Sequence, residues 1–440
     1  MSNPTTPFSW QMPTATDLVT DLPADFEVFG QAVATSMQDL LGGTTGQILA
    51  KASATNMDFA WITNDVGDIT AVTAGTGITG GGTSGAVTVS FDQENFGGGQ
   101  WAAGKNKIIN GDFGINQRVF TSTTTNGAYG FDRFLITASD GTTTYTPQTF
   151  TLGAAPVAGY EGKNYARLVT TGQTLTTAAS KLNYYFEGVR TFAGQTVTVS
   201  FWAQAGSGTP SVAVEFQQSF GSGGSPSAIV NTIIASPAKQ AITTSFARYS
   251  FTIAVPSISG KTIGTNNDDV LILGLWVSAG TSFNARTGSL GIQSNTFNFW
   301  GIQAEAASTA SPFQTATGNP ALELAACQRY YQKSFRQTTA PAQNAGLNGA
   351  VTLAQALSGA LDQTVGGVRL PNVMRTSPTI TTFNPSAANA QIRNVTRATD
   401  WSSTAAENIG DAGFGIQAVG PVGGVAGDRA LVHYTADAEF

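Results

Sequence analysis

Residues 196–204 alternate apolar and polar side chains without interruption, and this alternation constrains the fold more than any other feature of the sequence. One face carries Val197, Val199, Phe201 and Ala203, and the opposite face carries Thr198, Ser200, Trp202 and Gln204. A period of two is typical of a β-strand with one buried face, because successive side chains of a strand point to opposite sides. The segment is therefore predicted to be a half-buried strand.

The same period recurs in two later segments, residues 211–217 and residues 249–255. The side chains predicted to point inward are Val212, Val214, Phe216, Tyr249, Phe251, Ile253 and Val255. Residues 269–276 are apolar on both faces, which is typical of a strand buried on both sides. Strands at this spacing, with no helical run between them, predict an antiparallel, jelly-roll-like β-sandwich over residues 101–318.

Composition excludes several classes of protein. Only 11% of the 440 residues are charged, the net charge is −6, and no cluster of Lys and Arg is present, which argues against a nucleic-acid partner. The single Cys327 excludes an intrachain disulfide framework, and the single His433 excludes a His-rich metal site. No apolar run approaches about 18 residues, so we expect neither a signal peptide nor membrane insertion. If the protein acts outside cells, we expect it to leave them by assembly or lysis.

Residues 1–42 combine a polar tail with a predicted helix. The tail, residues 1–20, is either disordered or an anchor that orders on a partner. The helix is predicted from an apolar stripe made of Leu22, Phe26, Phe29, Val33 and Leu40. A helix of about 20 residues is marginal alone. It either packs on copies of itself or lies on a globular domain.

Residues 43–100 are rich in Gly, Ser and Thr between short pieces of strand length. The predicted strands cover residues 47–51, 58–62, 69–73 and 86–91. One chain has too little apolar surface here for a core of its own, whereas three chains wound together would share one. We therefore interpret this stretch as a β shaft, and the glycines of residues 96–99 as a flexible joint.

A second β-domain is predicted over residues 319–440. Asn319 is placed as the cap of a short helix, with Pro320 at its first position, and the helix is expected over residues 321–326. Strands are then predicted at residues 367–370, 379–383, 390–396, 413–419 and 428–434. The last of them ties the end of the sequence into a sheet.

Several short stretches resemble one family of proteins when taken in order along the chain. Residues 43–55 and 74–85 look like shaft segments of bacteriophage tail fibres. Residues 105–113, 131–134 and 299–303 are similar to the carbohydrate-binding-like sandwich of phage tail proteins, and residues 327–331, 374–379 and 433–439 resemble the tip of such fibres. The resemblance implies a homotrimeric virion fibre, made in the host cytoplasm. Its N-terminus would dock on tail or baseplate proteins, and its distal part would bind polysaccharide on the host cell.

A glycan site needs aromatic faces ringed by amides and carboxylates. Strand parity places such side chains on outward faces, and Trp401 is a further candidate at the tip. The predicted glycan-binding residues are Tyr185, Glu187, Trp202, Gln204, Glu215, Gln217 and Trp401. The alternative is that Trp202 and Tyr185 lie in a subunit interface or under a covering loop, as in a collar or connector fibre that binds no receptor.

Catalysis and metal binding have weaker signals. The sequence lacks a Gly-x-Ser-x-Gly elbow, a Walker loop and a His-Glu-x-x-His motif, and no cofactor is expected. Glu187 and Glu215 are the carboxylates that a polysaccharide depolymerase would use, but no parallel β-helix repeat is visible, so a non-enzymatic protein is predicted. Asp112 is the candidate ligand for a structural calcium ion. His433, Trp300 and Arg375 are predicted to be structural, with Arg375 pairing with Asp437 or Glu439.

Overall fold

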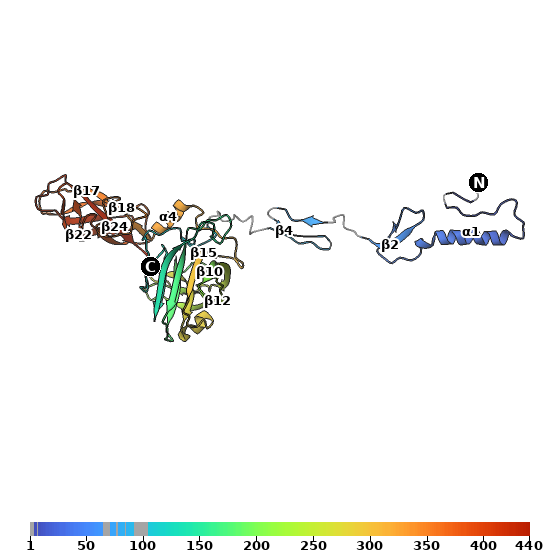
Figure 1. The fold of residues 1–440 in the computed structure, drawn as a ribbon, viewed down its shortest axis with the longest axis horizontal. Helices are drawn as coiled ribbons and strands as arrows, with labels where there is room; N and C mark the ends of the chain where they lie inside the picture. The colour runs from blue at the N-terminus through green and yellow to red at the C-terminus, as the bar shows by residue number, and fades with distance from the viewer. Residues whose placement is uncertain (1–3, 7, 65–70, 76–77, 84, 92–103) are drawn as a thin grey trace. The chain divides into compact units, whose positions relative to one another are not determined.

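The computed structural model describes residues 4–6, 8–64, 71–75, 78–83, 85–91 and 104–440. It is mainly β, with 8% of the residues in helices and 39% in strands. The chain divides into two compact units, Met1–Phe91 and Asp92–Phe440, which are described separately (Figure 1). No helix in the described part of the chain has both the length and the apolarity needed to cross a membrane.

The first unit begins with the predicted helix, α1 (Leu22–Ser36), and the short 3-10 helix η1 (Gln38–Leu40). α1 is shorter than expected, and none of its residues is buried. Trp10 folds back onto α1, because its indole N–H donates to Ser36 Oγ at 2.9 Å and its ring meets Phe29 at 6.1 Å. Described residues of the polar tail therefore contact the helix within one chain.

Short strands follow α1. β1 (Gln47–Lys51) pairs with β2 (Phe59–Thr63), and β3 (Val72–Thr73), β4 (Ile78–Gly82) and β5 (Val89–Phe91) form a three-stranded sheet. The predicted strand over residues 47–51 is confirmed at both ends. Part of the predicted strand at 69–73 and the whole predicted joint at 96–99 lie outside the described residues.

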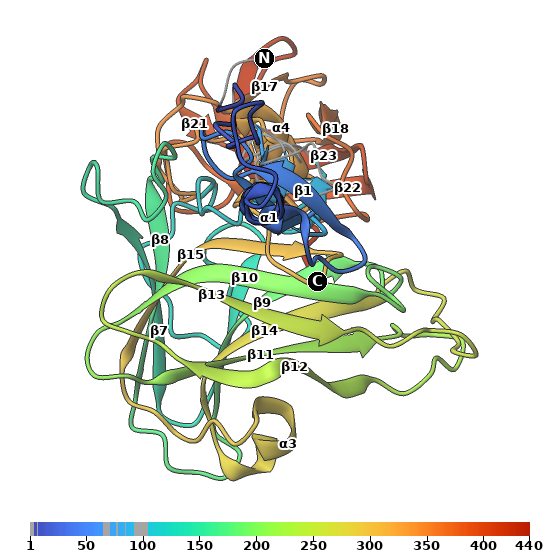
Figure 2. The same ribbon diagram turned by 90° about the vertical axis from the view of Figure 1, so that its right-hand side faces the viewer.

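The second unit contains a ten-stranded antiparallel sheet that nearly closes on itself. Its order is β6-β9-β14-β11-β12-β13-β10-β15-β8-β7. The strands are β6 (Phe134–Ser139), β7 (Thr142–Thr149), β8 (Asn164–Thr171), β9 (Ala179–Glu187), β10 (Thr196–Ala205), β11 (Ser211–Ser219), β12 (Val230–Ala241), β13 (Ala247–Ala254), β14 (Val270–Ala279) and β15 (Thr296–Glu305). Two short helices follow β14, η3 (Thr281–Phe283) and α3 (Asn284–Thr287), and α3 lies beside β12 (Figure 2).

The sheet has two halves, which we name the β14 half (β6, β9, β14, β11 and β12) and the β10 half (β13, β10, β15, β8 and β7). Their inner faces share one hydrophobic core. The predicted parity is confirmed, since Val197, Val199 and Phe201 are fully buried in that core together with Val212 and Val214. The antiparallel β architecture expected from the alternation is therefore present.

The tight turn between β6 and β7, the two end strands of the sheet order, depends on Gly141. Asp140 and Gly141 form a two-residue loop with φ values of +60° and +63°, both in the left-handed region. A Cβ at position 141 would lie 2.5 Å from the carbonyl oxygen of Thr171.

We expect Gly141→Ala to lower the free energy of unfolding by about 1–2 kcal/mol, because alanine is strained in a left-handed backbone conformation. The close contact of the added Cβ with the carbonyl oxygen of Thr171 should add to this loss. Gly127→Ala is the matched control, because φ is +79° there and nothing lies within 4 Å of an added Cβ. Urea unfolding measures both variants. Equal losses would show that the contact with Thr171 contributes nothing.

The rest of the second unit is the C-terminal β-domain. α4 (Pro320–Gln328) begins as predicted, with Asn319 Oδ1 accepting hydrogen bonds from the backbone N–H groups of Ala321 and Leu322. The strands are β16 (Tyr331–Lys333), β17 (Val351–Ala354), β18 (Asp362–Arg369), β19 (Thr379–Phe383), β20 (Arg393–Asn394), β21 (Thr399–Asp400), β22 (Ser402–Gly410), β23 (Gly413–Val419) and β24 (Arg429–Asp437). β24 pairs with β16, β17, β19 and β20, while β18, β23 and β22 form a second sheet.

Three arginines connect this domain to the ten-stranded sheet through residues 437–440. Arg133, which is fully buried, forms an ion pair with Glu439, and its guanidinium lies 3.4 Å from the centre of the Tyr330 ring. Arg118 reaches Asp437 at 3.2 Å and Glu439 at 3.7 Å. Arg375, which belongs to the C-terminal domain, donates from Nε to the carbonyl of Ala438 at 3.0 Å and from NH1 to the carbonyl of Asn267, between β13 and β14, at 3.3 Å. We name this arrangement the arginine clamp.

Candidate functional site

A row of polar side chains crosses the outer face of the β10 half. Strand register places Arg167 of β8 opposite Asn298 of β15, and Asn298 opposite Gln204 of β10. Arg167 Nε donates to Asn298 Oδ1 at 2.8 Å, Asn298 Nδ2 donates to Gln204 Oε1 at 2.7 Å, and Gln204 Nε2 donates to the carbonyl of Thr244 at 3.0 Å. We name Arg167, Asn298 and Gln204 the polar row. The hydrogen bonds fix the orientation of both amides.

Half-buried aromatic rings flank the polar row. Tyr165 and Phe246 meet with ring centres 5.5 Å apart, and the hydroxyl of Tyr165 accepts a hydrogen bond from Arg167 at 3.3 Å. Trp202 lies next to the buried Trp300, at 5.4 Å, and under the guanidinium of Arg248, at 4.9 Å. Aromatic faces beside fixed amide and guanidinium groups can bind the C–H surface and the hydroxyls of a sugar together.

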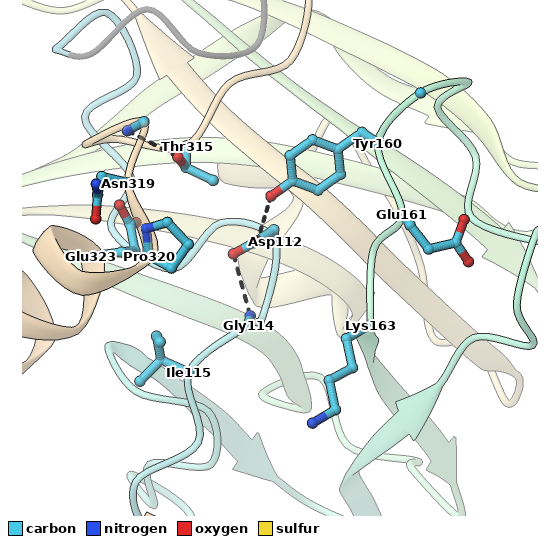
Figure 3. Close-up of a pocket in the computed structure, with 12 residues that line it drawn as sticks. Asp112, Gly114, Ile115, Tyr160, Glu161, Lys163, Thr315, Asn319, Pro320 and Glu323 are labelled. Carbon is cyan, nitrogen blue, oxygen red and sulfur yellow. Dashed lines mark hydrogen bonds between the residues drawn. The ribbon is translucent and has the colours of Figure 1, made fainter.

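A cavity of about 340 Å³ lies beside the start of α4, and we name it the α4 pocket. Its walls come from three separate segments, residues 112–115, 159–163 and 315–323. In Figure 3 the hydroxyl of Tyr160 points to Asp112, and Pro320 and Glu323 of α4 lie on the far side of Asp112. Tyr160 donates to Asp112 Oδ2 at 2.7 Å.

Glu323 is the most buried carboxylate of the α4 pocket, with 3% of its surface exposed. It accepts hydrogen bonds from the backbone N–H of Asn110 at 2.6 Å and from the hydroxyl of Thr317 at 2.7 Å. Burial raises the pKa of Glu323, and the nearby charge of Asp112 raises it further, while the hydrogen bonds act in the opposite direction. Burial and the charge of Asp112 also raise the pKa of Tyr160, which therefore keeps its proton at neutral pH.

The predicted glycan residues do not gather on one surface. They would share a face only if their strands were neighbours, but Trp202 and Gln204 lie in the β10 half, and Tyr185, Glu187, Glu215 and Gln217 lie in the β14 half. Only Trp202 and Gln204 join the arrangement described above. The strand order does not meet the condition for one common face, and sequence parity alone cannot supply that order.

Carboxylates of the β14 half are held in ion pairs. Glu215 is fully buried between Lys181 Nζ, at 3.2 Å, and Arg286 NH2, at 2.6 Å. Gln217 donates to Glu215 at 3.0 Å and is 8% exposed. Glu187 accepts hydrogen bonds from Nε of Arg329 at 2.8 Å and from NH2 of Arg329 at 2.5 Å. The two glutamates that a depolymerase would use are thus each neutralised by cations.

Of the remaining aromatic residues, Tyr185 is half-buried, whereas Trp401 and Trp300 are buried. Tyr185 packs against Phe440, with ring centres 6.1 Å apart. Trp401 is 2% exposed and belongs to the core of the C-terminal domain, so its ring is not presented at the surface. Trp300, predicted to be core, is fully buried.

His433 and Arg375 have structural positions. The imidazole of His433 is hydrogen-bonded to Ser334 Oγ at 2.9 Å and to the carbonyl of Gly346 at 3.0 Å, as expected of a satisfied structural residue. Arg375 was expected to pair with the carboxylate of Asp437 or Glu439, but it binds the backbone carbonyls of Ala438 and Glu439 instead. Arg118 and Arg133 occupy the two carboxylates.

Asp112 was the predicted calcium ligand. Its two carboxylate oxygens accept hydrogen bonds from the backbone N–H of Gly114, at 3.2 Å, and from Tyr160. Within the described ranges, no group of three or more His, Cys, Asp or Glu side chains is placed to hold a metal ion. Calcium binding at Asp112 stays a prediction.

Sequence reasoning missed Tyr165, Arg167, Phe246 and Asn298. A signal was present for two of them, since residues 164–169 alternate and place Tyr165 and Arg167 on one face. No sequence signal joins β8 to β15 or β15 to β10, and those pairings create the polar row. The α4 pocket was missed for the same reason, because its three segments are distant in sequence.

No protein-family model and no curated protein matches this chain. Solved structures give weak similarity. A tailspike protein 4 enzymatically active domain of bacteriophage CBA120 has 13% identity and a TM-score of 0.25, over 46% of this chain and 21% of the tailspike chain. The CBM22-1 xylan-binding domain of Paenibacillus barcinonensis Xyn10C has 10% identity and a TM-score of 0.25, over 47% of this chain and 98% of that domain.

A family 11 carbohydrate-binding module from Clostridium thermocellum, solved with a β-1,3-1,4-mixed-linked tetrasaccharide, is also similar. It has 11% identity and a TM-score of 0.24, over 43% of this chain and 98% of the module. Similarity at this level assigns no function to this chain, whose site has to be judged by its own residues.

Proposed function

We propose that the protein is a non-enzymatic, homotrimeric virion tail fibre that binds glycan on the host bacterial surface. The observation that carries the proposal is the polar row of Arg167, Asn298 and Gln204, held between half-buried aromatic rings on the outer face of the β10 half. The first unit, with its exposed helix α1, would dock on other tail or baseplate proteins and supply the trimer contacts.

The polar row suits a weak saccharide ligand. Asn298 is 3% exposed and orients Arg167 and Gln204, the half-buried members of the row that a ligand would reach. Because both side chains are already oriented, less conformational entropy is lost on binding. Tyr165 and Phe246 would contact the apolar face of a sugar ring, and the guanidinium of Arg167 would donate to its hydroxyls. A trimer would present three such faces, and multivalency raises avidity by a factor of about 10²–10⁴ without new contacts.

Replacing Tyr165 with alanine is expected to weaken binding to host surface polysaccharide about tenfold, because the ring next to the polar row is lost. Tyr185→Ala is the matched control, since Tyr185 lies in the β14 half and packs on Phe440. Trp202→Ala and Arg167→Ala test the same face. Affinity is measured on the full chain with isolated polysaccharide, after circular dichroism has shown that each variant is folded.

Each alternative has its own outcome. If Tyr185→Ala abolishes binding and Tyr165→Ala does not, the glycan site lies in the β14 half. If the wild-type protein binds no host cell or polysaccharide, a collar or connector fibre is the better description. If the purified protein sediments as a monomer, the proposed homotrimer is wrong, and so is the shared core proposed for residues 43–100.

A further inference from the structure

The α4 pocket is separate from the polar row. The ring of Tyr160 packs on Trp300 at 5.6 Å and on Phe313 at 5.5 Å, which turns its hydroxyl away from the aromatic layer and toward Asp112 (Figure 3). Neither Arg167 nor Asn298 nor Gln204 lines the cavity. A volume of about 340 Å³ is at the lower end of the range of small-molecule sites, and suits a ligand of about one sugar ring.

The charge of the α4 pocket is predominantly negative. Its walls carry three carboxylates, those of Asp112, Glu161 and Glu323, against one ammonium group, that of Lys163. Lys163 forms no ion pair within the described part of the chain. In a partly enclosed site of low dielectric, this excess of carboxylates repels an anion and attracts a cation.

The polar groups of the pocket retain capacity for a ligand. An ionised carboxylate offers about four lone-pair positions. Asp112 uses one for Gly114 and one for Tyr160, and Glu161 accepts from the backbone N–H of Gly153 at 2.8 Å. The pocket therefore offers acceptors to hydroxyl or ammonium donors, and Lys163 offers a donor to a hydroxyl oxygen.

Apolar wall is also present. Ile115 and Pro320 line the cavity together with Tyr160. A pyranose has the matching character, because it presents C–H groups on its faces and hydroxyls around its edge. A purely inorganic cation would make no use of these walls.

From the cavity, its charge and its apolar walls, we infer that the α4 pocket binds a monosaccharide-sized, hydroxyl-rich ligand that carries an ammonium group, such as an amino sugar, and excludes anionic sugars. The site is independent of the glycan face proposed on the β10 half. It gives the protein a second saccharide specificity, set by charge.

Saturation-transfer NMR and calorimetry on the full chain test this inference with glucosamine, glucose and glucuronate as probes. We expect glucosamine to bind with a dissociation constant of about 1 mM, glucose more weakly, and glucuronate least. Raising the salt concentration should reduce the difference between glucosamine and glucuronate, because the discrimination is electrostatic.

Two variants localise the binding. Asp112→Asn should weaken glucosamine binding about tenfold, because a charge-assisted hydrogen bond is lost. Glu161→Gln should weaken glucosamine binding by a smaller factor, about three. It should also reduce the ratio of the affinity for glucosamine to the affinity for glucuronate. Glu161 is exposed, so Glu161→Gln should leave the domain folded. This variant therefore still tests the site if Asp112→Asn proves to be unfolded. Glu407→Gln, in β22 and outside the pocket, changes the net charge equally and should leave glucosamine binding unchanged.

Three outcomes would overturn the inference. They are glucuronate binding as tightly as glucosamine, no detectable binding of glucosamine at tens of millimolar, and an equal effect of Glu161→Gln and Glu407→Gln. The variant Tyr165→Ala distinguishes binding at the α4 pocket from the glycan binding proposed on the β10 half. It should weaken polysaccharide binding on the β10 half about tenfold and leave glucosamine binding unchanged.

Discussion

Glu439→Gln is expected to lower the free energy of unfolding of the second unit by about 3–5 kcal/mol, the range found when one member of a buried ion pair is removed. Glu439 has 4% of its side chain exposed, and its partner Arg133 has none exposed. Burial is the largest single influence and lowers the pKa of Arg133, but Glu439 together with the neighbouring tyrosines outweighs it, and the net pKa is raised. In the variant, the buried charge of Arg133 would lose its ion-pair partner.

Asp437→Asn is the matched control for the arginine clamp. Asp437 is two residues from Glu439 and also binds Arg118, but 41% of its side chain is exposed. Exposed pairs contribute about 0–1 kcal/mol, so this variant should lose little. Urea unfolding gives the stability, and hydrogen exchange in β9 and α4 reports whether the contact between the two domains loosens. Equal losses in the two variants would show that burial of Glu439 does not matter.

Glu215→Gln is expected to destabilise the ten-stranded domain by a similar amount, about 3–5 kcal/mol. The carboxylate lies between two cations, and both cations also lie over the ring of Trp276, Lys181 at 4.7 Å and Arg286 at 5.3 Å. Arg286 belongs to α3, which packs on β11 and β12. The variant should therefore release α3 first, and hydrogen exchange in α3 should rise before the sheet unfolds.

The effect of Glu215→Gln should depend on pH. Burial lowers the pKa of Lys181 from 10.5, and Glu215 opposes that shift. Removing the opposing charge lowers the pKa further, so the unfolded state binds more protons than the folded state between the lowered pKa of the folded state and 10.5. Stability of the variant should then rise as the pH rises through this window. If the variant is less stable than the wild type by the same amount at every pH between about 6 and 10, removing Glu215 does not change the titration of Lys181, and this prediction is wrong.

Glu187→Gln provides the comparison for Glu215. Glu187 is 37% exposed and its partner Arg329 is 41% exposed. Burial raises the pKa of Glu187, but the hydrogen bonds from Arg329 and Tyr330, together with the charges of Arg329 and Arg375, outweigh it and lower the pKa overall. A solvent-screened pair of this kind should contribute no more than about 1 kcal/mol. If Glu187→Gln and Glu215→Gln lower the free energy of unfolding equally, burial of Glu215 between Lys181 and Arg286 does not add to stability.

The fold was predictable wherever the information is local. Alternation at Val197, Val199 and Phe201 gave the correct inward face of β10, and Asn319 with Pro320 gave the correct start of α4. These predictions succeed because strand parity and helix capping depend on neighbouring residues in the chain. The predicted strand at 390–396 shrank to β20, and β22 was missed, because weak alternation is decided by pairing partners.

By itself, the sequence determined the β class, the inward faces of the main strands and the cap of α4, because these follow from spacing within short segments. Only the tertiary structure decided which strands are neighbours. That order separates Trp202 from Tyr185, brings Arg167, Asn298 and Gln204 into one row, and buries Glu215 between two cations. The physical reason is that hydrogen-bonded strand pairing and burial join residues far apart in the chain, and no local pattern records the partner.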